Sequence, residues 1–195
     1  MEFAVKGLLS RHQSLGVRQN LFFTSYTHPE RDPGCLLRAH DFLRSFTGQF
    51  CHALVMFDRE GCGQEKESRQ DLELLVEGHL SGGGWADRCA AIVLDPELEI
   101  WVWSNSPEVD GILGWGGRQP SLRIWLERQG LMNPQSVKPD QPKDPKNALE
   151  RALKFVGKPR SSAIYEQLAF KVGLKECVDP AFLKFKDKLH HWFPA

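Results

Sequence analysis

Short apolar runs alternate with helical patterns along the first two-thirds of the chain. Residues 53–57 (ALVMF) and 90–94 (AAIVL) are continuous apolar runs, which are typical of strands buried on both faces. Residues 20–25 (NLFFTS) predict a further strand. Apolar residues recur at helical spacing in three other segments, residues 2–14, 32–46 and 65–80. This order of helices and strands predicts an α/β domain with a mainly parallel sheet flanked by helices.

The last third of the chain has a different pattern and is predicted to be helical. Helices are expected over residues 98–103, 108–113, 122–129, 145–155, 161–172 and 180–190. Residues 133–144 hold three prolines and no apolar periodicity, which predicts a surface loop. We therefore expect an α/β domain over residues 1–130, followed by a loop and a helical C-terminal extension over residues 131–195.

Charge and cysteine content exclude several classes of protein. Lys+Arg and Asp+Glu both number 25, which excludes a strongly basic nucleic-acid-coating protein and an acidic disordered tail. The balanced charge does not exclude a basic groove on part of the surface. The five cysteines form no C-x-x-C pair, which argues against a structural zinc site or a disulfide framework. No apolar run approaches the roughly 18 residues of a membrane span, and residues 1–6 do not resemble a signal peptide, so a cytoplasmic protein is expected.

Acidic residues follow both of the buried strands. Asp58 and Glu60 come after the first, and Asp95 and Glu97 come after the second. Ligands bind beyond the carboxyl ends of the strands in open parallel sheets, and crowded carboxylates repel one another unless a cation neutralises them. Mg²⁺ suits such oxygen ligands, and Asp58 and Glu60 could face one ion. The sequence also allows structural roles for these acids. Asp58 could cap the next helix, and Glu97 and Glu99 could lie at the start of a helix, where the helix dipole favours acidic side chains.

Several other residue types have both a structural and a functional interpretation. Lys138 and Lys143 could contact phosphate as point charges or could lie on a solvated surface. Arg59 could neutralise a phosphate or pair with a nearby carboxylate. Tryptophans at helical spacing are favoured as core residues over base-stacking platforms, namely Trp101, Trp103, Trp115 and Trp125.

Four stretches of the chain resemble a family of small Toprim-like bacterial proteins: EFAVKGLLSR, ALVMFDREGCG, DPELEIWVW and CVDPAFLKF, which begin at Glu2, Ala53, Asp95 and Cys177. Members of that family occur with phage-defence operons, including a methylation-associated defence system. The Toprim fold is a small parallel sheet with helices on both sides, and it is found in topoisomerases, primases and the overcoming-lysogenization-defect nucleases. In the generic Toprim pattern, Glu2 matches the lone first glutamate, and Asp58 and Glu60 match the Asp-x-Asp pair.

The resemblance implies a Mg²⁺- or Mn²⁺-dependent nuclease of an antiviral defence system. Glu2, Asp58 and Glu60, with Asp95, would hold the metal, and Lys143 would assist catalysis. Arg59, Lys138 and Lys143 would contact the substrate. The alternative is a non-catalytic binding or scaffold subunit of a defence complex. The expected partners are nucleic acid and other defence proteins, and no membrane partner is expected. A homodimer is a further alternative.

Two features depart from the Toprim pattern. A strand precedes the first glutamate of a Toprim domain, whereas Glu2 follows Met1 here. We therefore expect either a natural start further upstream or another segment in place of that strand. Glu60 stands where the generic motif has aspartate, and its side chain is longer by one methylene group.

Overall fold

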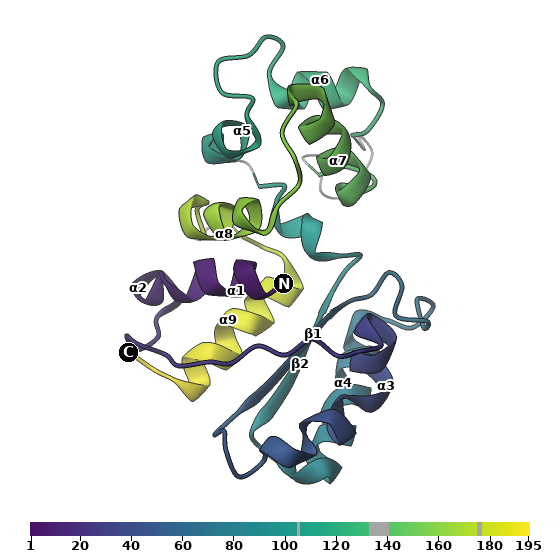
Figure 1. Ribbon diagram of the computed structural model, residues 1–195, viewed down its shortest axis with the longest axis vertical. Helices are drawn as coiled ribbons and strands as arrows, with labels where there is room; N and C mark the ends of the chain where they lie inside the picture. The colour runs from purple at the N-terminus through teal and green to yellow at the C-terminus, as the bar shows by residue number, and fades with distance from the viewer. Residues whose placement is uncertain (105, 133–140, 175–176) are drawn as a thin grey trace. The chain divides into compact units, whose positions relative to one another are not determined.

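The computed structural model describes residues 1–104, 106–132, 141–174 and 177–195. Packing divides the chain into two units that are interleaved in sequence, and Figure 1 shows the elements of both. The helical unit comprises residues 1–19 and 99–179 together with Ala195, and the sheet unit comprises residues 20–98 and 180–194. The division at residue 130 stays a prediction about the domain organisation of the chain.

The sheet unit is built on two parallel strands. Strand β1 (Ala53–Asp58) pairs with β2 (Cys89–Leu94) in a register that runs from Ala53 opposite Cys89 to Asp58 opposite Leu94. Helices α3 (Arg31–Leu43) and α4 (Arg69–Leu80) pack against the strands, and α9 (Pro180–Trp192) packs against β2. Two short helical turns complete the unit, η1 (Arg44–Phe46) and η2 (Ser81–Trp85). The predicted α/β class with parallel strands is confirmed.

The apolar runs explain why these strands lie at the centre of the sheet unit. Residues Ala90–Leu94 are fully buried, as expected for a strand covered on both faces. Strand β1 instead alternates between buried and half-buried residues, so one of its faces is less covered than the sequence predicts. The buried face packs against apolar residues of α3 and α4, namely Leu36, Ala39, Leu72, Val76 and Leu80.

The strand predicted over residues 20–25 is absent, so the prediction is wrong for this segment. Among the residues that the structure describes, none forms a backbone hydrogen bond with Asn20–Ser25. The side chain of Phe22 is 85% exposed. Strand-forming residues favour an extended chain, but a strand also needs a partner in register, and that partner is set by tertiary structure.

The helical unit contains the remaining helices. Helix α1 (Glu2–Leu9) and the short α2 (His12–Leu15) replace the single helix expected over residues 2–14. The 3₁₀ turn η3 (Leu98–Trp101) leads from the sheet unit into the helical unit. The other helices are α5 (Pro107–Leu113), α6 (Leu122–Arg128), α7 (Pro145–Val156) and α8 (Ser162–Lys171). Helix α1 approaches α8 closely at Gly7, where an added Cβ would lie 2.4 Å from the Glu166 carbonyl oxygen.

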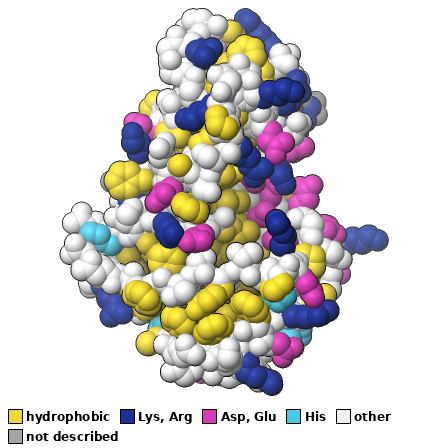
Figure 2. Space-filling view, in the orientation of Figure 1, with side chains coloured by type: hydrophobic (Ala, Val, Ile, Leu, Met, Phe, Trp, Pro, Cys, Tyr) yellow, Lys and Arg dark blue, Asp and Glu magenta, His cyan; other side chains and the backbone are white. Residues whose placement is uncertain are grey.

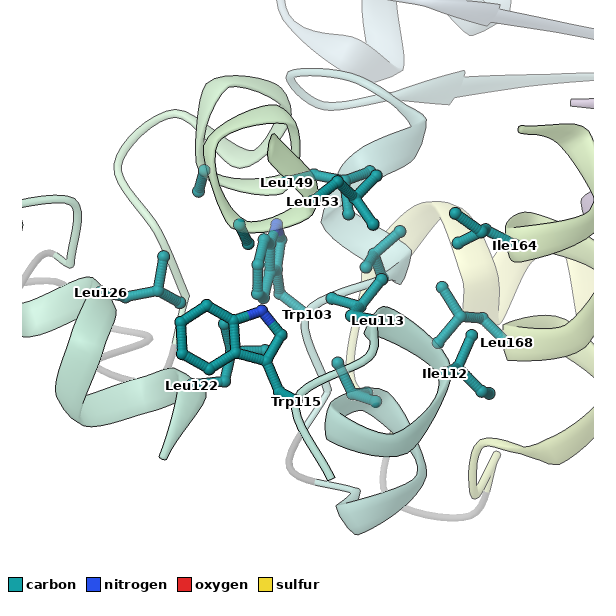
Figure 3. Close-up of a cluster of buried hydrophobic side chains, with 14 of the residues drawn as sticks. Trp103, Ile112, Leu113, Trp115, Leu122, Leu126, Leu149, Leu153, Ile164 and Leu168 are labelled. Carbon is teal, nitrogen blue, oxygen red and sulfur yellow. The ribbon is translucent and has the colours of Figure 1, made fainter. Parts of the chain in front are cut away.

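Aliphatic residues form most of the core of the helical unit, and tryptophans pack among them (Figure 3). Trp103, Trp115 and Trp125 are buried, which confirms the prediction that they are core residues. Trp101, which the sequence also predicts as a core residue, is only half-buried. The Trp103 indole N–H donates to the Pro145 carbonyl oxygen at 2.9 Å. The predicted loop over residues 133–144 lies largely outside the described residues, which resume at Gln141. Within the described parts of the chain, no helix is both long and apolar enough to cross a membrane.

Candidate metal site

The carboxyl ends of β1 and β2 meet at one edge of the sheet. The register places Asp58 opposite Leu94, the last residue of β2. Beyond the strands, the Arg59 N–H donates to the Leu94 carbonyl oxygen at 2.8 Å, and the Glu60 N–H donates to the Pro96 carbonyl oxygen at 2.9 Å. The segments that follow the two strands therefore run side by side, as the sequence predicts for parallel strands.

Backbone and side-chain hydrogen bonds fix the position of Asp58. Its Oδ1 atom accepts a hydrogen bond from the Leu98 N–H at 3.0 Å. Its own N–H donates to Oδ1 of Asp32, in the first turn of α3, at 3.3 Å. These bonds join Asp58 to the turn that follows β2 and to the start of α3. Asp58 thus serves a structural role in addition to any role as a ligand.

Three carboxylates converge at this edge. One oxygen atom from each of Asp58, Glu97 and Glu99 lies within 4.8 Å of the others. Glu97 and Glu99 are 3% and 2% exposed, which is rare for glutamate unless it is paired. The chain passes from the sheet unit to the helical unit between Leu98 and Glu99. Glu97 and Glu99 therefore lie on the two sides of this boundary but only two residues apart in the chain. The cluster could hold a metal ion.

The Glu99 carboxylate has two partners within the helical unit. Oε1 of Glu99 accepts hydrogen bonds from the Arg160 guanidinium and from the Tyr165 hydroxyl, the latter at 2.6 Å. Arg160 also binds Glu150 at 2.9 Å. Burial, followed by the hydrogen bond and charge of Glu99, raises the pKa of Tyr165 well above its usual value. Tyr165 is therefore a neutral donor, and a metal ion at the cluster would share Glu99 with Arg160.

The cluster overlaps only in part with the residues singled out from the sequence. Asp58 belongs to it, whereas Glu2, Glu60 and Asp95 are not among its members. Glu2 forms an exposed ion pair with Lys6 at 2.7 Å, and Glu60 is exposed. These three acids stay predictions as metal ligands.

The basic residues expected at the substrate have different surroundings. Arg59 pairs with Asp95 at 3.0 Å, which is the structural alternative that the sequence left open. Lys143 is exposed, and its backbone N–H donates to the Leu131 carbonyl oxygen at 2.9 Å. Lys138 lies outside the described residues. The contacts of Lys138 and Lys143 with phosphate stay predictions.

Cys35 lies on α3, three residues after Asp32. Burial, and then the charge of Asp32, raises the pKa of the Cys35 thiol to about 11. Because the thiolate is the reactive form, we expect iodoacetamide near neutral pH to label the exposed Cys51 well before Cys35, and Cys35 labelling to rise as the pH approaches 11. Mass spectrometry of the labelled peptides measures both sites. Equal labelling of Cys35 and Cys51 near neutral pH would contradict the expectation.

No protein-family model, curated protein or solved structure matches the chain. The carboxylate cluster is therefore the structural feature that bears most directly on function.

Proposed function

We propose that the chain is a Mg²⁺- or Mn²⁺-dependent nuclease, a Toprim-like cytoplasmic component of a bacterial antiviral defence system. The convergence of the Asp58, Glu97 and Glu99 carboxylates at the carboxyl ends of two parallel strands carries the proposal. Opposed ligands of Mg²⁺ lie about 4 Å apart, so oxygens within 4.8 Å of one another can meet on one ion after small side-chain movements. The sequence resemblance supplies the expected chemistry, hydrolysis of phosphodiesters.

In this proposal, Asp58 and Glu97 hold the metal ion, with Glu99 as a third ligand. The metal would lower the pKa of a bound water and stabilise the leaving oxygen of the phosphodiester. The Leu98 N–H orients the Asp58 carboxylate, and Tyr165 and Arg160 orient that of Glu99. Lys143, Lys138 and Arg59 are the proposed contacts to phosphate, and Arg59 would have to exchange Asp95 for the substrate.

The Arg160–Glu99 pair favours a second candidate function. An arginine bonded to one carboxylate compensates part of the negative charge that would otherwise attract a cation. The cluster would then be a structural junction, and the chain would act as a non-catalytic subunit that binds a partner protein or nucleic acid. The two functions differ in whether a divalent metal binds and whether cleavage depends on it.

Cleavage assays test the proposed function directly. We expect the purified protein to cut plasmid or single-stranded DNA with Mg²⁺ or Mn²⁺, and to be inactive in EDTA. RNA substrates are assayed in parallel because the proposal does not depend on the sugar. Absence of cleavage on all substrates, together with no detectable Mn²⁺ binding by calorimetry, would contradict the nuclease and favour the binding subunit.

A further inference from the structure

The sheet has two edges, and α4 closes the edge at β2. The outward N–H groups of Ala91 and Val93 donate to side-chain oxygens of Glu77 and Glu73, each at 3.0 Å. Lys184 of α9 binds both glutamates, at 2.7 and 3.0 Å. Two carboxylates therefore occupy the positions at which a neighbouring strand would accept hydrogen bonds, and β2 cannot pair further.

The edge at β1 is closed in this way only at its carboxyl end, where the outward N–H of Asp58 donates to Oδ1 of Asp32 at 3.3 Å. The Ala53 N–H donates to the Arg88 carbonyl oxygen at 2.9 Å, so the odd-numbered residues of β1 point their backbone groups toward β2. The backbone N–H and C=O groups of Leu54 and Met56 therefore point away from β2. Within the described residues, nothing accepts a hydrogen bond from the N–H of Leu54 or Met56. Both residues are only half-buried, unlike the fully buried residues of β2.

The same unit contains a segment, residues 20–25, for which the described residues offer no backbone partner. Asn20 has a φ of 61°, so a strand formed by this segment would begin at Leu21. Residues Asn20–Ser25 have the composition of a strand, with two phenylalanines and a threonine. In the described parts of the chain no backbone hydrogen bond involves them, although Leu21 and Phe23 are half-buried while Phe22 and Thr24 are exposed. This alternation is that of a strand. Figure 2 shows hydrophobic side chains at the surface in the region where Figure 1 draws the strands and this segment.

We propose that the β1 edge is an interaction surface for a second copy of the chain, which adds its residues 21–25 as a strand beside β1. One copy leaves Leu54 and Met56 at this edge, and the segment itself, without backbone partners among the described residues. Two copies related by a two-fold axis satisfy both reciprocally. The exchange also covers Phe22, which is 85% exposed in the single chain. This inference does not depend on the metal site or on nuclease activity.

Hydrogen exchange and molecular mass measured on the same samples test the proposal. We expect light scattering to show a dimer at high protein concentration and a monomer on dilution. Protection of the Leu54 and Met56 amides is expected to fall by about tenfold or more as the dimer dissociates. This comparison uses the native chain alone, so it does not depend on the folding of any variant.

Proline variants identify the strand that is added. Proline cannot donate to a ladder but is accepted in a segment that makes no backbone hydrogen bonds, so Phe22→Pro combined with Phe23→Pro should give a folded monomer. Phe22→Thr keeps strand-forming character and should remain a dimer. A chain that is monomeric at all concentrations overturns the proposal. A dimer that persists in the double-proline variant also overturns it. The same holds if the protection of the Leu54 and Met56 amides is unchanged on dilution.

Discussion

Replacing Glu97 by glutamine is expected to weaken Mg²⁺ or Mn²⁺ binding by about 100-fold, the upper end of what even outer-shell changes cost at metal sites. Glu97 is 3% exposed, and one of its oxygens lies within 4.8 Å of oxygens from Asp58 and Glu99. Glutamine has nearly the same shape but no charge, so the fold should be retained while a ligand is lost. Cleavage should fall in parallel with metal binding.

Calorimetry with Mn²⁺ on three single variants separates the two candidate ligand sets. Asp58→Asn should resemble Glu97→Gln because Asp58 belongs to both sets. Glu60→Gln and Glu2→Gln should bind metal as the native protein does, since neither residue is a member of the structural cluster. If Glu2 and Glu60 proved necessary and Glu97 did not, the ligand set predicted from the sequence would be correct and the cluster would be a structural junction.

The sequence predicts the strands of this site better than it predicts the ligands. Two runs of apolar residues identify β1 and β2, and the acids that follow them mark the edge at which Asp58 lies. The burial of Glu97 and Glu99 could not be predicted. It depends on the 3₁₀ turn over Leu98–Trp101 and on Arg160, which lies 61 residues away from Glu99 in sequence. The only local signal for these ligands is that acids spaced two residues apart, Asp95, Glu97 and Glu99, directly follow the second buried strand.

The edges of the sheet show the same limit of sequence reasoning. Residues 20–25 have the composition of a strand, yet nothing local tells whether a partner lies beside them. Glu73 and Glu77 lie four residues apart on α4 and suggest an exposed helix face in the sequence. In the structure Glu73 is 2% exposed and binds the backbone of β2, and its charge is compensated by Arg69 on the same helix and by Lys184 on α9. The contacts of Glu73 with Val93 and Lys184 are distant in sequence, so the sequence alone does not reveal this role.

Replacing Glu73 by alanine is expected to lower the free energy of unfolding by about 3–5 kcal/mol, the usual cost of removing one partner of a buried ion pair. The change leaves Arg69 and Lys184 without this carboxylate and leaves the Val93 N–H without its acceptor. Urea unfolding followed by circular dichroism measures the loss. Gln70→Ala, at an exposed position of the same helix, should change the free energy by about 0.5 kcal/mol or less.

A glutamine at position 73 separates the two roles of the side chain. Glu73→Gln keeps an oxygen that can accept from the Val93 N–H but removes the charge that pairs with Arg69 and Lys184. Because an unsatisfied buried backbone donor costs about 1–3 kcal/mol, Glu73→Gln should be more stable than Glu73→Ala by about that amount. Equal losses for the two variants would show that the ion pairs alone stabilise this edge. A loss below about 1 kcal/mol for Glu73→Ala would contradict the role of Glu73 as the residue that closes the sheet.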